Sequence, residues 1–245
     1  MKGMLNFLTS LYSPKNYTQV RRKLAFFLFF ELWLATFFLR GLPPIEALFS
    51  AVEQAGPMEA IASLLPAVAK LNLTGLILAI FVTTICYAIT LHDRISDLLE
   101  IRKKFDYQHI LLPLAKLVNV RLSAAQKIRI QENQDSLMRQ VFYKFASSRA
   151  KNPIVDKHDI ERALEAWSWF WIMVEAIPFA VVFGIVACVA KGTTLTITFL
   201  AIAFALFAAA WFSTRRFPRF ARPQIEAIAH TPVSFRAVRK VFSAI

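Results

Sequence analysis

Residues 91–110 read LHDRISDLLEIRKKFDYQHI and residues 159–171 read DIERALEAWSWFW, and these two stretches decide the fold. Both join a charged segment, residues 92–165, to a strongly apolar run, and neither junction contains a Gly or a Pro that would end a helix. We therefore expect a soluble helical unit that is fused at each end to a membrane helix. Such an arrangement predicts coupling between a cytoplasmic event and the bilayer.

Four apolar stretches predict an all-α membrane protein with four transmembrane helices. Hydrophobic residues make up 57% of the 245-residue chain, and the mean hydropathy of +0.49 exceeds what a soluble domain of this length needs. About 20 apolar residues are needed to cross a bilayer. The expected spans are residues 24–39, 71–91, 167–190 and 193–212, of which the first is short.

The distribution of positive charge predicts the orientation. Of the 29 lysines and arginines, 26 fall in residues 1–23, 92–165 and 213–245, and the positive-inside rule places these on the cytoplasmic side of a bacterial inner membrane. Both termini are therefore expected in the cytoplasm. The predicted order is a basic, amphipathic N-terminus 1–23, a transmembrane pair 24–91 with an outer-face loop 41–70 of two short helices, a helical cytoplasmic domain 92–165, a transmembrane hairpin 166–212 and a basic cytoplasmic tail 213–245.

Polar residues inside the apolar helices are candidates for lining a pore or a subunit contact. A buried carboxylate costs several kcal/mol unless it is paired, protonated or facing water. Alternatively, the acids are neutral and bonded to a neighbour, and the hydroxyls bond to helix carbonyls. The hydroxyl stripe would continue through Arg94 and Asp97 if its helix runs on through Lys104. The candidates are Glu31, Thr83, Tyr87, Thr90 and Glu175.

Small residues predict how the last two spans pack. The linker 190–194 is so short that these spans must form an antiparallel hairpin, and small residues at every fourth position let membrane helices approach closely. Cys86 and Cys188 lie inside apolar helices and are interpreted as packing residues. The small-residue faces are Ala176, Ala180, Gly184 and Cys188 in the third span and Ala201, Ala205 and Ala209 in the fourth.

The cytoplasmic segment is expected to hold at least three helices. Residues 109–120 are apolar and would pack under the membrane or in a subunit contact. Ser123 and Gln126 form a capping box that would open a long helix to about residue 147. Asp156, with Asp159, would cap the helix leading into the third span. The apolar positions of the long helix come close to a heptad seam, which permits a coiled coil between subunits: Ile130, Leu137, Val141 and Phe145.

The formal net charge of +13 lies mostly beside the membrane. One interpretation is attraction to anionic lipids, and the other is a site for a polyanion such as a nucleotide. In the tail, arginines alternate with Phe217 and Phe220, a pattern typical of base stacking or of interfacial anchoring. The residues assigned to the lipid surface are Arg21, Arg22, Lys23, Arg215, Arg216, Arg219 and Arg222.

Motifs of catalysis are missing from the sequence. It contains no P-loop, no G-x-S-x-G, no H-E-x-x-H and no Cys/His cluster with zinc spacing, so we expect no enzyme, no cofactor and no metal site. Arg102 and His109 are spaced as in the R-x(4–6)-H motif and resemble HEPN ribonucleases. A membrane-bound ribonuclease is therefore kept as a third hypothesis.

In layout and charge, over its full length, the chain resembles the small multi-pass membrane effectors of bacterial anti-phage defence, such as the DNA-gated channel of Hailong-type systems and the membrane subunit of Kiwa-type systems. This resemblance implies a homo-oligomer, with a tetramer favoured, whose cytoplasmic part binds an anionic ligand and changes the state of the membrane part. We predict an ion channel-like effector gated by a nucleotide or single-stranded nucleic acid. The predicted ligand-binding residues are Arg102, Lys103, Lys104, Arg121, Lys127 and Arg129.

A second hypothesis is a membrane anchor or sensor that does not conduct and that recruits a soluble cytoplasmic protein. Its docking surface would be formed by the apolar residues 109–120 and the long helix 123–147. Binding that survives high salt would favour this hypothesis over gating by a polyanion, because apolar interfaces are not screened.

Overall fold

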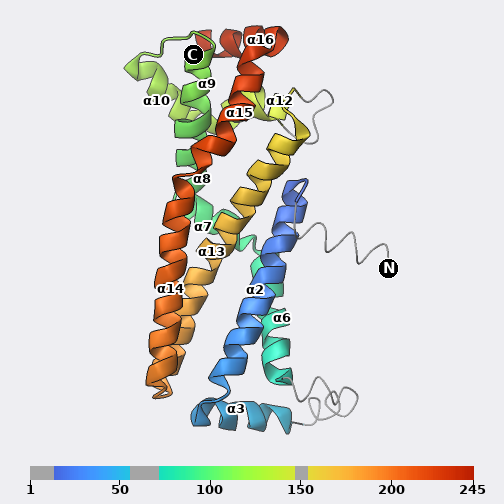
Figure 1. Cartoon of the computed structure of the whole chain (residues 1–245), viewed down its shortest axis with the longest axis vertical. Coiled ribbons are helices and arrows are strands. Elements are labelled where there is room, and N and C mark those ends of the chain that lie inside the picture. The colour runs from blue at the N-terminus through green and yellow to red at the C-terminus, as the bar shows by residue number, and fades with distance from the viewer. Residues whose placement is uncertain (1–13, 56–71, 147–153) are drawn as a thin grey trace, which may run out of the picture. The chain divides into compact units, whose positions relative to one another are not determined.

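The computed structural model describes residues 14–55, 72–146 and 154–245, and within these ranges the chain is helical and contains no strand (Figure 1). This confirms the all-α prediction. The described chain divides into two compact units, which we call the membrane unit (Arg21–Leu91 and Trp169–Phe212) and the head unit (Met1–Val20, His92–Ser168 and Ser213–Ile245). The helix α13, Lys157–Val189, contributes to both.

In its described residues, the membrane unit contains four long helical segments and one short helix. Among residues 14–55, 72–146 and 154–245, two helices are long and apolar enough to cross a membrane, or up to four if each bent helix pair counts as one span. The structure therefore supports two to four membrane-spanning segments. It confirms that the chain has apolar helices long enough to span a membrane, and the number four stays a prediction. The helices of the membrane unit are part of α13 together with α2 Tyr17–Leu39, α3 Pro43–Glu53, α6 Leu73–Ala88 and α14 Thr193–Thr214.

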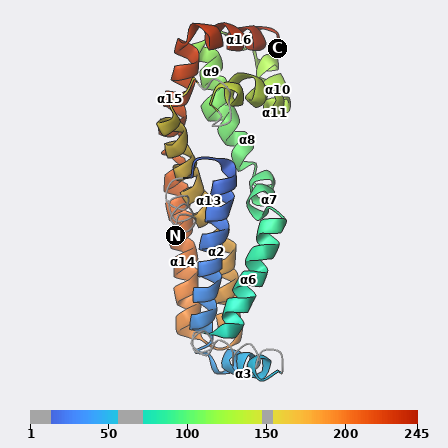
Figure 2. The ribbon, with the colours of Figure 1, turned by 90° about the vertical axis from the view of Figure 1, so that its right-hand side faces the viewer.

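Helix α3 is the first of the two short helices predicted in the outer loop. It is bent by 111° from α2 (Figure 2). Arg40 holds it there, because its guanidinium bonds to Glu46 at 2.7 Å and to Glu53 at 2.8 Å, and Glu53 also accepts a bond from the Thr74 hydroxyl at 3.0 Å. The second predicted short helix lies in residues 56–71, outside the described residues.

The predicted antiparallel hairpin is formed by α13 and α14. Gly184 is buried, and a Cβ atom there would lie 3.3 Å from the Leu200 side chain, so this glycine allows close packing. Ala176 and Ala180 of the predicted face of α13 are also buried, whereas Cys188 is exposed.

The predicted small-residue face of α14 is wrong. Ala201, Ala205 and Ala209 are exposed in the chain. The buried face contains Phe199, whose ring lies 5.8 Å from that of Phe183 on α13. The same face also contains the buried Ala203 and Ala210, so α14 does bury small residues, but at other positions than those predicted.

The predicted continuation of the second span through Lys104 is also wrong. Helix α6 ends at Ala88, and α7, Leu91–Leu98, begins only after Thr90, whose φ is 51°. A residue in the left-handed region stops the α-helical hydrogen-bond ladder. The polar stripe of Thr83 and Tyr87 therefore does not continue along the same helix to Arg94 and Asp97.

The head unit has a large apolar core made by the central segment together with the C-terminal tail. The core includes fully buried residues from both, such as Leu114 and Ile228. The helices of this unit, besides α7 and the start of α13, are α8 Ile101–Phe105, η1 Asp106–Leu111, α9 Leu112–Leu117, α10 Ala124–Glu132, α11 Gln134–Met138, η2 Arg139–Tyr143, α12 Lys144–Ala146, α15 Phe217–His230 and α16 Pro232–Ser243.

The apolar face of residues 109–120 was expected to lie under the membrane, in a subunit contact or on a docking surface, but most of this face is buried in the core of its own chain. Leu111, Leu114 and Val118 are 0% exposed. The predicted heptad seam is buried in the same core, so it faces its own chain rather than a second subunit: Ile130, Leu137, Val141 and Phe145.

The long helix predicted from Ser123 is confirmed at its start and wrong in its continuity. Both hydrogen bonds of the capping box between Ser123 and Gln126 are present. The helix breaks at Asn133, and residues Arg139–Tyr143 form a π-helix. Asp156 caps α13 as expected, since its carboxylate accepts a 2.7 Å bond from the backbone N–H of His158.

Candidate anion-binding site

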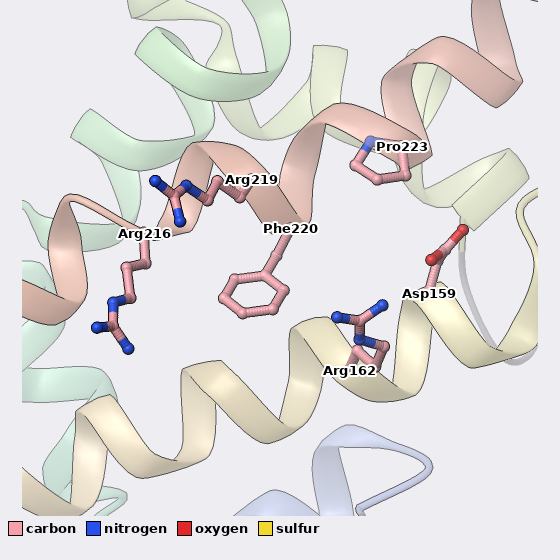
Figure 3. A pocket seen from close by; sticks show the side chains of 6 residues that line it. All are labelled: Asp159, Arg162, Arg216, Arg219, Phe220 and Pro223. Atoms are coloured by element: carbon pink, nitrogen blue, oxygen red, sulfur yellow. The ribbon is translucent and has the colours of Figure 1, made fainter.

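A pocket of about 290 Å³ in the head unit brings basic side chains from two helices together (Figure 3). The ring of Phe220 projects from α15 toward α13, and Arg162 reaches toward it from α13. The arginines of the α15 segment lie on one side of the ring and the carboxylate lies on the other. The lining residues are Asp159, Arg162, Arg216, Arg219, Phe220 and Pro223.

Helical periodicity explains why these side chains share one face. Arg216 is the N-cap of α15, and Arg219, Phe220 and Pro223 follow at the three-, four- and seven-residue spacings of one helix face. The opposite face of α15 is apolar and includes the core residue Ile225. Burial of that face against the core therefore turns the arginines outward. On α13, Asp159 and Arg162 are likewise three residues apart, beside the buried Ile160.

The pocket carries an excess of positive charge. The guanidinium groups of Arg162, Arg216 and Arg219 make no hydrogen bond or ion pair with any residue in the described parts of the chain. Asp159 is the one acid among the lining residues. The N-terminus of α15 adds the partial positive charge of a helix end. Three free guanidinium groups suit an anion that offers several oxygen acceptors, above all a phosphate.

A second charged cluster in the head unit is internally paired. The side chain of Arg102 lies 3.7 Å from the carboxylate of Asp106 and donates a 3.2 Å bond to the hydroxyl of Tyr143. Burial raises the pKa of Asp106 to about 7, although Arg102 opposes this shift. Burial also raises the pKa of Tyr143. Asp106 and Tyr143 lie in the two π-helices, η1 and η2, a helix type that is often found at functional sites.

Aromatic rings connect this paired cluster to the start of α15. The ring of Phe105 lies 5.3 Å from Trp167 and 5.6 Å from Phe217, and the last two rings are 5.1 Å apart. His109 packs on Phe105 at 5.5 Å, and burial lowers the pKa of His109. Phe217 follows the pocket residue Arg216 directly. The packed rings therefore extend from Phe105, which precedes Asp106, to Phe217, which follows the pocket residue Arg216.

The comparison with known proteins identifies the family. Residues 16–244 match the YmfE protein family. The chain belongs to this family. The match includes both units and the whole pocket. No curated protein and no solved structure matches the chain.

Three of the six predicted ligand-binding residues of this YmfE-family chain have partners elsewhere in the head unit. Arg102 belongs to the paired cluster, Lys104 lies 3.6 Å from Glu100, and Arg129 donates a 3.0 Å bond to the carbonyl of Ile245. The pocket contains none of these six residues, which also include Lys103, Arg121 and Lys127.

Of the basic residues assigned to the lipid surface, Arg216 and Arg219 line the pocket, and Arg22 and Arg215 are exposed. Lys23 is 0% exposed, with its ammonium group 4.2 Å from the ring centre of Trp169. The sequence did not indicate this buried position. Two others also have partners: Arg21 donates a 2.8 Å bond to the carbonyl of Tyr87, and Arg222 bonds to Glu226 at 2.7 Å.

The candidate intramembrane residues occupy different environments. Glu175 is 5% exposed, and Glu31 is half-buried. The hydroxyl of Thr83 is buried and has no hydrogen-bond partner among the described residues, whereas Tyr87 lies under the guanidinium group of Arg21, which is 4.5 Å from its ring centre. Thr90, the last residue of the predicted stripe, lies at the helix break.

The described residues contain no group of three or more His, Cys, Asp or Glu side chains that could hold a metal ion, and Cys86 and Cys188 are free thiols. Arg102 and His109, the pair that resembles the HEPN motif, have separate partners, Tyr143 and the Phe105 ring.

Sequence reasoning missed the contribution of α13 to the pocket. Asp159 was interpreted as a cap residue, and Arg162 was not singled out. The available signal was their three-residue spacing on a helix that leads into a span, which places them on one face. The sequence did not reveal that this face lies opposite the arginines of the tail.

Proposed function

We propose that this protein is a ligand-responsive, multi-pass protein of the bacterial inner membrane, with both termini and the head unit on the cytoplasmic side. In this proposal the pocket binds a phosphate-bearing anion, and binding changes the state of the membrane helices. The positive-inside distribution of charge supports the orientation.

One observation carries the proposal: the guanidinium groups of Arg162, Arg216 and Arg219 meet in one pocket and have no partner within the described chain. A charge-assisted hydrogen bond contributes about 1.5–3 kcal/mol when its partner is present. Arg102 and Arg222, in contrast, pair with acids in the head unit. The free arginines are therefore available to a ligand.

Helix α13 supports the response to binding. It carries Asp159 and Arg162 in its first two turns and continues without interruption into a segment that can cross a membrane. A ligand that contacts Arg162 therefore acts on the same rigid element that enters the bilayer. The ion channel predicted from the sequence is one form that this response can take.

The test of binding uses full-length protein in lipid nanodiscs and three phosphate probes: pyrophosphate, ATP, and phosphatidylglycerol supplied in the nanodisc. We expect at least one probe to bind with an affinity that falls roughly tenfold in the double variant Arg162→Ala/Arg219→Ala. The matched control is Arg236→Ala/Arg239→Ala on α16, which removes the same charge from exposed positions of the same unit. Binding that is equally weakened in both variants, or absent for all three probes, would contradict the proposed site.

The test of the response measures hydrogen exchange along α13 and ion flux in vesicles, each with and without the probe that binds. We expect the probe to change exchange beyond the first turns of α13, in residues toward Glu175. If the probe changes hydrogen exchange only around the pocket, the protein binds the anion but does not transmit binding to the membrane helices.

A further inference from the structure

We propose that the occupant of the pocket is the headgroup of an anionic phospholipid from the adjacent membrane leaflet, and that the headgroup carries hydroxyl groups, as phosphatidylglycerol does. This inference rests on the proposed phosphate site and names its ligand. A lipid phosphate and a free phosphate offer the same oxygen atoms to the arginines, so the position of the pocket along its helices decides between them.

The distance of the pocket from the apolar part of each helix corresponds to the depth of lipid phosphates. Arg162 precedes Trp167, where the apolar run of α13 begins, by five residues, which is roughly 7.5 Å of helix. Arg216 follows Phe212, the last apolar residue of α14, by four residues, or roughly 6 Å if the chain stays helical. The headgroup region extends about 5–8 Å beyond each side of the hydrocarbon core. Both helices therefore place their arginines among the headgroups.

Exposed aromatic residues mark the same level independently. Trp211 is 56% exposed and Phe212 is 61% exposed, and Phe212 lies four residues before the pocket residue Arg216. On α13, Trp169 is 44% exposed and lies about two turns beyond Arg162. Tryptophan concentrates at membrane interfaces, where its ring meets the glycerol and headgroup region. Both helices thus carry an interfacial ring on the membrane side of the pocket.

The other lining residues fit a lipid headgroup. Phe220 and Pro223 form an apolar wall beside the arginines, which suits the glycerol backbone of a lipid. Asp159 is an acceptor when ionised, so it can receive a hydrogen bond from a headgroup hydroxyl while the arginines hold the phosphate. A choline headgroup is itself a cation, and it would add to a pocket in which three guanidinium groups already face one carboxylate. The charge of the lining therefore favours a glycerol headgroup, which has no cation, over choline.

The experiment is native mass spectrometry of the full-length protein, released from detergent that contains equal amounts of phosphatidylglycerol and phosphatidylcholine. We expect the wild type to retain phosphatidylglycerol roughly tenfold more than phosphatidylcholine, and Arg162→Ala/Arg219→Ala to lose this preference. The control Arg236→Ala/Arg239→Ala should keep it. In parallel, pyrophosphate and ATP are titrated into the protein in phosphatidylcholine nanodiscs.

Each outcome decides between the two proposals. Equal retention of phosphatidylglycerol by the wild type and the pocket variant would overturn the lipid assignment. Binding of pyrophosphate or ATP that depends on Arg162 and Arg219, without a preference for phosphatidylglycerol, would also overturn it but would leave the proposed phosphate site standing. If neither lipid nor soluble phosphate binds at the pocket, both proposals fail.

Discussion

Arg102 and Arg219 lie in the same unit, and the structure uses them differently. Arg102 is held by Asp106 and Tyr143, whereas Arg219 lines a pocket and has no partner among the described residues. Both occur in basic runs of the sequence, Arg102 beside two lysines and Arg219 among the arginines of the tail. The difference teaches that a count of positive charges does not identify a binding site. A basic side chain is available to a ligand when the fold does not already place an acid beside it.

Local sequence explains much of this difference. Arg102 and Arg222 each have an acid four residues later, Asp106 and Glu226, and both ion pairs form. Arg219 has no acid three or four residues away in either direction. Arg162 is the exception, because Asp159 and Glu165 are both three residues away and neither pairs with it among the described contacts.

The largest predicted effect concerns the pH dependence of the paired cluster. In the folded protein the pKa of Asp106 is about 7, against an ordinary value of 3.8, so the folded state binds a proton that the unfolded chain releases. The head unit therefore gains stability as the pH falls through 7, and the gain is complete near pH 4. We expect the free energy of unfolding of the head unit to rise by about 2–3 kcal/mol when the pH is lowered from 8 to 5. Asp106→Asn should remove this pH dependence of stability.

Hydrogen exchange of the amides of Ile110, Leu111 and Leu114 measures this effect in the full-length protein, because these residues lie in the core and the first two share helix η1 with Asp106. Exchange free energies at pH 5 and pH 8 are compared for the wild type and Asp106→Asn. The matched control is Asp97→Asn, an exposed carboxyl on α7. The prediction is wrong if Asp106→Asn keeps the pH dependence of the wild type.

The sequence predicted the elements that depend on local patterns. Helical class, the capping box at Ser123 and the hairpin of α13 and α14 follow from composition, spacing and linker length. The breaks at Thr90 and Asn133 were missed because neither residue is a Gly or a Pro, the usual signals of a helix end. At Asn133 the side-chain amide donates a 3.0 Å bond to the carbonyl of Arg129 four residues earlier.

The sequence did not predict which segments, far apart along the chain, pack against each other. The apolar face of residues 109–120 was expected to meet a membrane or another protein, because the sequence does not show that α15 and α16 cover it. The pocket was missed for the same reason. Its arginines were visible in the tail, but Arg162 joins them only once α15 packs in the head unit.

The intermediate prediction compares Arg102→Ala with Arg219→Ala. At pH 8 the loss of Arg102 leaves the carboxylate of Asp106 and the hydroxyl of Tyr143 without their donor, and we expect the free energy of unfolding to fall by about 1–2 kcal/mol. Arg219→Ala should change it by less than about 0.5 kcal/mol. Chemical denaturation of the protein in micelles, followed by the same amide exchange, measures the free energy of unfolding of both variants.

At pH 5 the loss of stability caused by Arg102→Ala should be smaller than at pH 8, because Asp106 is then protonated. Equal costs for the two variants would remove the distinction between paired and free arginines.

The smallest predicted effect tests whether the pocket recognises geometry or only charge. Arg219→Lys keeps the charge but replaces a planar fork of donors with a single ammonium group, which cannot bond two phosphate oxygens in parallel. We expect the affinity for the phosphate probe to fall by roughly threefold, less than for Arg219→Ala, with stability unchanged. Arg236→Lys, on the exposed face of α16, should leave binding unaltered. An affinity equal to that of the wild type would mean that Arg219 attracts the anion only through its field. The hydrogen bonds that orient the phosphate would then come from Arg162 and Arg216, the two remaining arginines that line the pocket with Phe220.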